Sequence, residues 1–341
     1  MSIEQNVDVA VAAPVTPLVG ARGLSASWIV FAVALAIAVA LPFGVKGFVI
    51  FQLTMLMIYA IAIVGLNLLT GFNGQFSLGH SAFYAIGAYT AAILMDKLDV
   101  AYFWTIPVAG VVSFAFGFLF GLPALRLEGI YLALATFGLS VATPQILKLS
   151  PLAYWTGGVQ GITIIKPDAP FDLPLSGDQW LYFLTLAIGL ALGLCALNLV
   201  RSRTGRALIA IRDNPIAAQA LGVNTALYKA LTFGLSALYT GIAGALGAIV
   251  VQFVAPDSFT LILSIGLLVG LVIGGVGWIP GALFGAAFIL FVPNFAESVS
   301  KGLSGVVYGL ILLALIYVMP SGVGGFVQML VGLARGALKK A

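Results

Sequence analysis

Ten apolar segments, separated by short polar or charged stretches, constrain what this chain can fold into more than any other feature. Several exceed the length of about 18 residues at which an apolar helix can cross a bilayer. The chain is 62% hydrophobic and 8% charged, a composition that no soluble core requires. We therefore predict an all-α polytopic membrane protein with about ten transmembrane helices. The segments are 27–45, 48–70, 80–95, 102–122, 127–147, 179–200, 230–254, 258–275, 278–295 and 304–320.

The basic residues predict the orientation of these segments, because Lys and Arg gather in cytoplasmic loops. Placing the most basic loop, 201–229, in the cytoplasm also places Arg126 and both termini there, and it places 148–178 and the loop of Asp257 outside. The N-terminal residues lack the basic start and early apolar run of a cleavable signal peptide. We expect a disordered cytoplasmic tail at 1–26, a transmembrane domain at 27–320 and a cytoplasmic C-terminal tail at 321–341.

The loop at 201–229 contains the start and stop signals of a short helix. Asp213 and Asn214 are both favourable N-cap residues. Pro215 suits the first helical position, and Gly222 suits the position just after the helix end. The loop is therefore predicted to be structured rather than a flexible tether.

The predicted helix spans residues 216–221, about two turns. Ile216, Ala220 and Leu221 fall on one face of it. A short capped helix that presents an apolar face outside the membrane is predicted to dock against another surface.

Two glycine-rich stretches, 71–81 and 274–281, interrupt the apolar pattern. Such interruptions in both halves of a membrane protein point to a transport pathway, although each is also compatible with a tight turn between hairpinned spans. The short segment at 80–95 is likewise compatible with one part of a broken helix. The first stretch contains two side-chain amides, two serines and the chain's only histidine. Its candidate pathway residues are Gly74, Gln75, Ser77, Gly79 and His80.

Glycines that recur at intervals of four predict places where helices approach closely in the membrane. Three such sets occur in the predicted spans. They are Gly266, Gly270 and Gly274; Gly281 and Gly285; and Gly189 and Gly193.

Several kinds of chemistry are missing from the sequence. No GxxxxGK[ST] phosphate-binding loop occurs, so the chain is not expected to hydrolyse ATP by itself. No acidic residue lies in the middle of a predicted span, which argues against a proton-driven carrier and less strongly against sodium coupling. The single cysteine, Cys195, permits neither a disulfide nor a metal cluster within one chain. We expect no catalytic residues, no metal site and no cofactor.

One short motif, Gly302–Gly305, is similar to the serine motif of intramembrane rhomboid proteases. The only available base, His80, precedes the serine in the chain, whereas it follows the serine in that family. An intramembrane hydrolase is therefore the least favoured interpretation, and a chance match is preferred.

Four stretches together resemble the membrane permeases of high-affinity branched-chain amino acid ABC importers, the LivM/LivH type. The resemblance extends over almost all of the chain from residue 50 onward. The stretches are GLNLLTGFNGQFSLGHSAFYAIGAYTAA (65–92), TGGVQGI (156–162), GRALIAIRDNPIAAQALGVNTALYK (205–229) and GGVGWIPGALFGA (274–286).

The resemblance implies a function for the predicted docking helix. Importer permeases in general insert an EAAxxxG segment into a cleft of the ATPase, and residues 217–222 fit its AAxxxG part. Ile216 stands where many importers have glutamate, so docking is expected to rest on apolar contact. The implied ATPase-coupling residues are Asp213, Asn214, Pro215, Ile216, Ala217, Ala218, Ala220, Leu221 and Gly222.

The resemblance also implies a localisation and partners. The chain is expected in a bacterial inner membrane, together with a second LivH-like permease, two cytoplasmic ATPases and a periplasmic binding protein. It would form the translocation path for branched-chain or related amino acids. The alternatives are a permease for another small polar solute, such as urea or amides, and a secondary carrier that works alone.

The first glycine-rich stretch suggests how such a substrate would be held. If the chain unwinds over 71–79, the helix that starts near His80 presents free N–H groups and its positive dipole end. We hypothesise that these groups, with Ser77 and His80, hold an amino-acid carboxylate. The competing interpretation of His80 is a polar residue that merely starts a helix.

Overall fold

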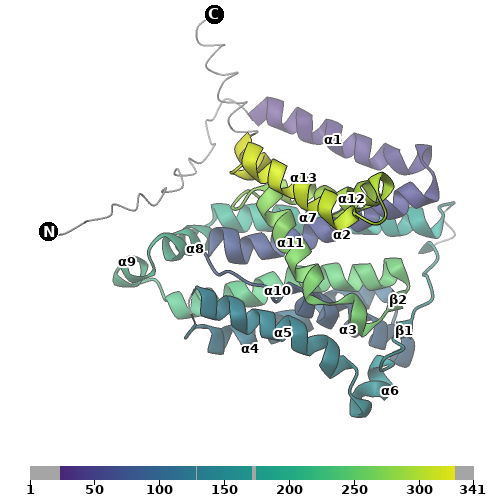
Figure 1. Ribbon diagram of the computed structural model, residues 1–341, viewed down its shortest axis with the longest axis horizontal. Helices are drawn as coiled ribbons and strands as arrows, with labels where there is room; N and C mark the ends of the chain where they lie inside the picture. Colours follow the sequence, from purple (N-terminus) through teal and green to yellow (C-terminus); the bar gives the residue numbers. More distant parts are fainter. Residues whose placement is uncertain (1–23, 128, 171–173, 327–341) are drawn as a thin grey trace, which may run out of the picture. The chain divides into compact units, whose positions relative to one another are not determined.

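The computed structural model describes residues 24–127, 129–170 and 174–326, and most of these residues are helical (Figure 1). Every one of the ten predicted apolar segments contains a helix, which confirms the all-α polytopic class. The outer parts of both predicted tails, 1–23 and 327–341, lie outside the described residues.

The chain divides into two units. The first unit, Met1–Val45, contains helix α1 (Leu24–Gly44), and the second, Lys46–Ala341, contains all the other elements. The helices of the second unit are α2 (Gly47–Leu66), α3 (His80–Leu98), α4 (Tyr102–Ala124), α5 (Ile130–Leu147), α6 (Ala153–Thr156), α7 (Gly177–Arg201), α8 (Arg203–Asp213), α9 (Pro215–Ala220), α10 (Thr225–Val251), α11 (Leu261–Gly274), α12 (Gly281–Val299) and α13 (Ser304–Val318).

Within the described residues, eight helical stretches are long and apolar enough to cross a membrane. The two other predicted segments form α1 and α3, which fall outside this set of eight. The first stretch, Gly47–Phe72, combines α2 with a π-helix, η1 (Asn67–Phe72). The last extends past α13 to Phe326, into the region predicted as the C-terminal tail.

Helix α10 forms the centre of the second unit. It packs against α4, α3 and α2, and Figure 1 shows it between α2 and the pair α4 and α5. From Ala230 to Val250 most of its residues are buried, because small side chains allow the neighbouring helices to approach. Helix α7 packs on α2, α11 packs against α12, and α13 contacts α12.

The glycine spacing correctly predicted one close helix pair. A Cβ on Gly285 would lie 2.0 Å from the carbonyl oxygen of Gly270, and one on Gly274 would lie 2.3 Å from that of Gly281. Helices α11 and α12 therefore touch through their backbones at these glycines.

For the remaining glycines, Gly266, Gly189 and Gly193, the prediction of close helix contact from the spacing was wrong. A Cβ on Gly266 or on Gly193 would meet no atom within 4 Å, and one on Gly189 would make only an ordinary contact with Ile61. Spacing places glycines on one face of a helix, but it does not show whether that face has a neighbour.

Two loops that were predicted to lie on the same side of the membrane meet in the structure. The strands β1 (Ile162–Thr163) and β2 (Phe253–Val254) pair antiparallel. Lys148 Nζ lies 2.5 Å from a carboxylate oxygen of Asp257, and this ion pair joins the same two loops. The pairing is consistent with the predicted topology, in which both loops lie outside.

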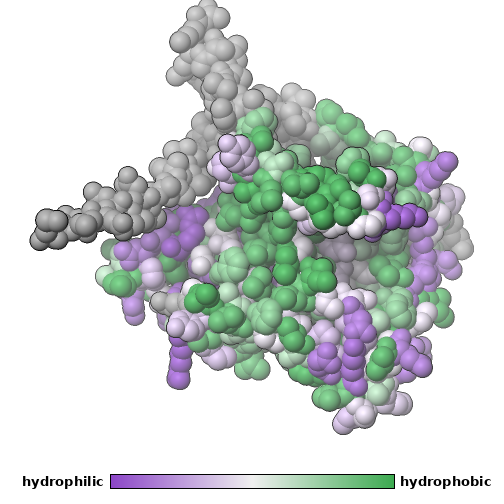
Figure 2. Space-filling view, in the orientation of Figure 1, coloured by the Kyte–Doolittle hydropathy of each residue, from purple (hydrophilic) through white to green (hydrophobic). Residues whose placement is uncertain are grey.

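The surface of the second unit is apolar over the middle of its helices. Figure 2 shows hydrophilic residues gathered near α8 and α9 on the left and near α6 and the strands on the right. An apolar band between two polar ends suits a bilayer, in which apolar side chains face lipid rather than water.

Candidate functional site

The predicted docking helix is present as α9, and its two caps explain why so short a helix forms. The side-chain oxygen of Asn214 accepts a hydrogen bond from the Ala217 N–H group (3.0 Å), and Pro215 is the first helical residue. At the other end the Gly222 N–H group donates to Gln219 and the Val223 N–H group donates to Ala218. This pair of bonds is a Schellman motif, which requires the left-handed conformation that Gly222 adopts (φ +84°).

Of the two candidate N-cap residues, Asn214 rather than Asp213 caps α9. Asp213 is the last residue of α8, and its carboxylate binds the guanidinium of Arg212 (2.9 Å). Asp213 therefore orients Arg212 instead of capping the docking helix.

Helix α8, which precedes α9, was not predicted. Ser202 caps it by accepting from the N–H groups of Thr204 and Gly205, and Leu208 and Ile211 anchor it in the protein. The signal was present in the sequence, because a serine N-cap precedes two apolar residues on one helical face.

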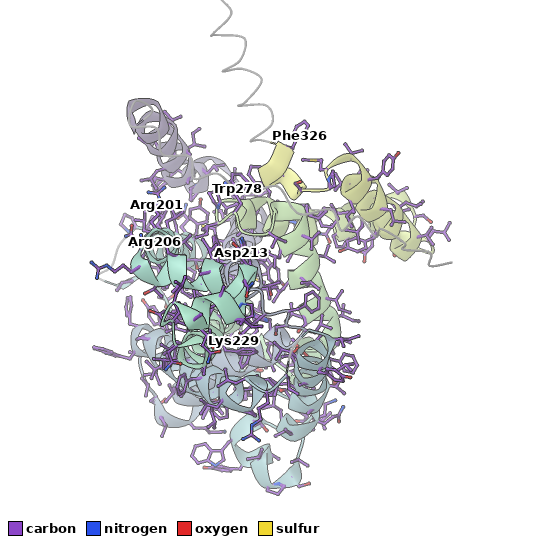
Figure 3. All side chains as sticks on the ribbon, turned by 90° about the vertical axis from the view of Figure 1, so that its left-hand side faces the viewer. Arg201, Arg206, Asp213, Lys229, Trp278 and Phe326 are labelled. Atoms are coloured by element: carbon purple, nitrogen blue, oxygen red, sulfur yellow. The ribbon has the colours of Figure 1, made fainter. Side chains whose placement is uncertain are left out.

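The apolar residues of the α9 segment point away from the rest of this chain. Ile216 is 79% exposed and Leu221 is 84% exposed, whereas Ala218 is 2% exposed. Ala218 thus holds the helix against its own protein, and Ile216 and Leu221 remain available to another surface. Figure 3 views this end of the molecule, where Arg201, Arg206, Asp213 and Lys229 are labelled.

The first glycine-rich stretch is longer than a tight turn. The helix changes to the π-form at Asn67–Phe72, residues 73–79 are non-helical, and α3 begins at His80. We call residues 73–79 the first break. Within it, Gly74 is exposed and adopts a left-handed conformation (φ +73°).

His80 and Ser77 form a closed, buried network. His80 is fully buried, with Nε2 2.8 Å from Ser236 Oγ and Nδ1 3.2 Å from Ser77 Oγ. Ser236 gives its own proton to the carbonyl oxygen of Gly65 (2.6 Å), so it accepts from His80. The neutral tautomer protonated on Nε2 therefore satisfies every one of these bonds.

The N–H groups at the start of α3 also have partners inside the protein. The Leu78 N–H group donates to Thr136 Oγ1 on α5 (2.9 Å), and the Ser81 N–H group donates to Ser264 Oγ on α11 (2.8 Å). Gly79 packs so closely on Thr136 that a Cβ would lie 3.1 Å from that residue. In this conformation the proposed anion site is filled by hydroxyl groups of the protein.

Two side-chain amides of the first break, unlike the N–H groups at the start of α3, contain atoms that lack hydrogen-bond partners among the described residues. Asn73 and Gln75 are buried, at 2% and 6% exposure. Within the described part of the chain, both amide atoms of Asn73 and the Gln75 Oε1 atom have no hydrogen-bond partner. A buried polar atom without a partner costs free energy, so these amides favour a hydrogen bond to a further group.

The second glycine-rich stretch lies against the first. We call residues 275–280, between α11 and α12, the second break; Gly275 and Gly277 there have positive φ angles of 107° and 79°. The side chain of Asn67 spans the two stretches, since its oxygen accepts from the Gly277 N–H group (2.8 Å) and its nitrogen donates to the Trp278 carbonyl (3.1 Å).

Arg212, near the C-terminal end of α8, reaches the same place. Its Nη1 atom donates to the carbonyl oxygen of Gly71 (2.9 Å) and lies 3.9 Å from where a Cβ of Gly277 would be. Neither Arg212 nor Asn67 was singled out from the sequence. A lone amide within an apolar span was the only available signal for Asn67, and Arg212 resembles any other loop arginine.

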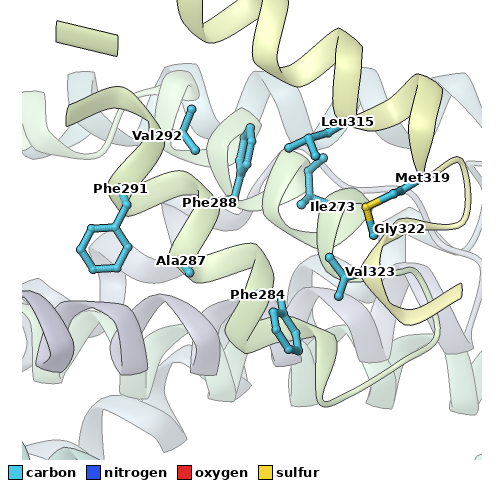
Figure 4. Close-up of a pocket in the computed structure, with 10 residues that line it drawn as sticks. All are labelled: Ile273, Phe284, Ala287, Phe288, Phe291, Val292, Leu315, Met319, Gly322 and Val323. Carbon is cyan, nitrogen blue, oxygen red and sulfur yellow. The ribbon is translucent and has the colours of Figure 1, made fainter. Parts of the chain in front are cut away.

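A separate pocket of about 310 Å³ lies between α12 and α13 (Figure 4). Its walls are apolar throughout and include Phe284, Phe288 and Leu315. It contains no side chain that could bind a charged or zwitterionic solute, and neither break contributes to it.

The fold and this arrangement define a class of protein: a multi-pass helical membrane protein with two interrupted segments beside a capped, outward-facing helix. A family model described as "Branched-chain amino acid transport system / permease component" matches residues 48–316. The chain belongs to this family. It is a multi-pass protein of a bacterial inner membrane.

Individual relatives agree with the family. The high-affinity branched-chain amino acid transport system permease protein LivM of Salmonella typhimurium is 38% identical over 71% of this chain and 62% of its own length. LivM of Escherichia coli is 33% identical over 89% of this chain and 76% of its own length. LivH of Salmonella typhimurium is 27% identical over 78% of this chain and 91% of its own length. No solved structure matches the chain.

Proposed function

We propose that this chain is a permease subunit of an ABC importer that forms the translocation path for branched-chain amino acids. The family and the names of its relatives support the class and the substrate. The observation that supports the subunit role best is α9, a helix capped at both ends whose Ile216 and Leu221 side chains face away from the protein. Exposed apolar side chains on a helix suit docking into an apolar groove of a partner.

The complete importer would contain this chain, a second LivH-like permease, two cytoplasmic ATPases and a periplasmic binding protein. In this proposal the ATPases hold α9 in a cleft and move it when they close on ATP. The substrate path runs beside the first break, at Gly74, Gln75, Ser77, Gly79 and His80. The free amides of Asn73 and Gln75 support this placement, because a substrate passing there would supply their missing hydrogen bonds.

The docking role predicts a specific effect of charge on α9. Replacing Leu221 by aspartate would bury a carboxylate without a guaranteed basic partner, which costs several kcal/mol. We expect Leu221→Asp to reach the membrane at the normal level, but to lose ATPase co-purification and the ATP hydrolysis that the loaded binding protein stimulates.

Gln219→Asp is the matched control. It adds the same charge to an exposed position of the same helix, about 160° around the helix from Leu221, and should leave all three measurements unchanged. Retention of the ATPases and of stimulated hydrolysis by Leu221→Asp would contradict docking through α9.

The substrate is tested by uptake into vesicles that contain the assembled importer. We expect ATP-dependent uptake of labelled leucine that is inhibited by valine and isoleucine and unaffected by urea. Uptake of urea or simple amides without uptake of leucine would contradict the amino-acid assignment. Uptake without ATP would instead indicate a secondary carrier.

A further inference from the structure

Arg212 connects the docking helix to Gly71 and to the first break by direct contact. It lies three residues before the first residue of α9, and Asn214, between them, is the N-cap of that helix. A chain segment this short spans at most about 3.6 Å per residue, so it has little slack to absorb a movement of α9. A displacement of the docking helix must therefore move the backbone at Arg212.

The Arg212 side chain is held at both ends of its guanidinium. Asp213 Oδ1 accepts from Nε at 3.0 Å and lies 2.9 Å from Nη2, whereas Nη1 donates to the Gly71 carbonyl at 2.9 Å. A planar guanidinium bound on two sides transmits displacement better than a flexible ammonium. Its charge also lies near the C-terminal end of η1, where the helix dipole is negative.

The backbone around the Arg212 side chain is closely packed, so a movement of Arg212 also displaces its neighbours. A Cβ on Gly74 would lie 2.9 Å from Arg212 Cγ, and one on Gly71 would lie 2.0 Å from Asn67 Oδ1 and 2.7 Å from Gly277 N. Asn67 in turn binds the backbone of Gly277 and Trp278. Asp213 and Trp278 are both labelled in Figure 3.

We propose that Arg212 is the positioning residue through which movement of α9 reaches both breaks, with Asn67 joining the second break to the first. This inference rests on the proposed function, because it assumes that ATPases move α9. Arg212 does not touch substrate in this scheme. Its loss should therefore separate ATP hydrolysis from transport rather than abolish both.

The test measures leucine uptake and ATP hydrolysis together in vesicles that contain the assembled importer and the loaded binding protein. For Arg212→Ala we expect ATPase co-purification and stimulated hydrolysis within about twofold of the unsubstituted importer. We expect the amount of leucine moved per ATP to fall roughly tenfold, which corresponds to the free energy of one hydrogen bond to a charged group. Arg212→Lys, which keeps the cation and one donor, should give an intermediate ratio. Asn67→Ala should lower the ratio in the same way.

Arg206→Ala is the control, since it removes the same charge from an exposed position on the same helix. An unchanged transport ratio in Arg212→Ala and Arg212→Lys would overturn the inference. Loss of membrane level or of co-purification in both variants would also overturn it, because Arg212 would then be needed for folding or docking. If the unsubstituted importer shows no stimulated hydrolysis, the proposed function itself fails.

Discussion

Ser236 joins three helices through one hydroxyl group. It donates to the carbonyl of Gly65 on α2 and accepts from His80 on α3, while it belongs to α10. In this conformation His80 is thereby held in the packed centre of the helices. Its ring nitrogens bond to Ser77 and Ser236 and not to the serine of the Gly302–Gly305 motif.

Removing this hydroxyl should destabilise the fold. Ser236→Ala leaves the His80 N–H group and the Gly65 carbonyl without their partner, at a cost of about 1–2 kcal/mol for buried hydrogen bonds within a membrane protein. We expect a lower thermal unfolding midpoint in detergent. Ser298→Ala, at an exposed helical position, is the control and should leave the midpoint unchanged. An equal midpoint for both variants would show that the network does not stabilise the fold.

Helices α11 and α12 approach each other where glycines face glycines. Gly274 and Gly281 each lie so close to the other's backbone that neither has room for a Cβ, and Gly285 packs in the same way on Gly270. This close approach fixes where the second break begins, since α11 ends at Gly274.

Substitution by alanine distinguishes glycines that pack against a neighbouring helix from glycines that do not. Gly274→Ala would place its Cβ 2.3 Å from the Gly281 carbonyl, so the two helices must separate. We expect less folded protein and a lower thermal midpoint. Gly266→Ala, two turns earlier on α11, meets no atom and should be neutral or slightly stabilising, because alanine favours helix over glycine. Equal thermal midpoints and equal amounts of folded protein for the two variants would contradict this prediction.

The second unit as a whole has two polar ends. One contains α8 and α9, and the other contains the paired strands and the Lys148–Asp257 ion pair. Basic residues gather in the loop of α8 and α9, which predicts that this end lies in the cytoplasm.

Thiol labelling tests this orientation. In a Cys195→Ala background, Ile165→Cys and Ala226→Cys place exposed thiols at opposite ends of the unit. A membrane-impermeant reagent should label Ile165→Cys in cells with a permeabilised outer membrane and label Ala226→Cys only after the inner membrane is opened. The reverse pattern would overturn the orientation, and with it the cytoplasmic docking of α9.

The sequence by itself determined the class of the fold and its local elements. Apolar length predicted the helices, because in a bilayer the backbone must satisfy its own hydrogen bonds. The caps of α9 were readable because a cap involves residues only a few positions apart, as with Asn214 and Ala217. The same holds for the two breaks, whose glycines lie within a few positions of one another in the chain.

Only the tertiary structure decided which of these elements meet. Arg212 and Gly71 are 141 positions apart, and Asn67 and Gly277 are 210 positions apart. A hydrogen bond over such a separation depends on how the helices between its partners pack, and no local pattern encodes that packing. The same reason explains why identical glycine spacings succeeded at Gly274 and failed at Gly193, where a Cβ would meet no atom of the described residues within 4 Å.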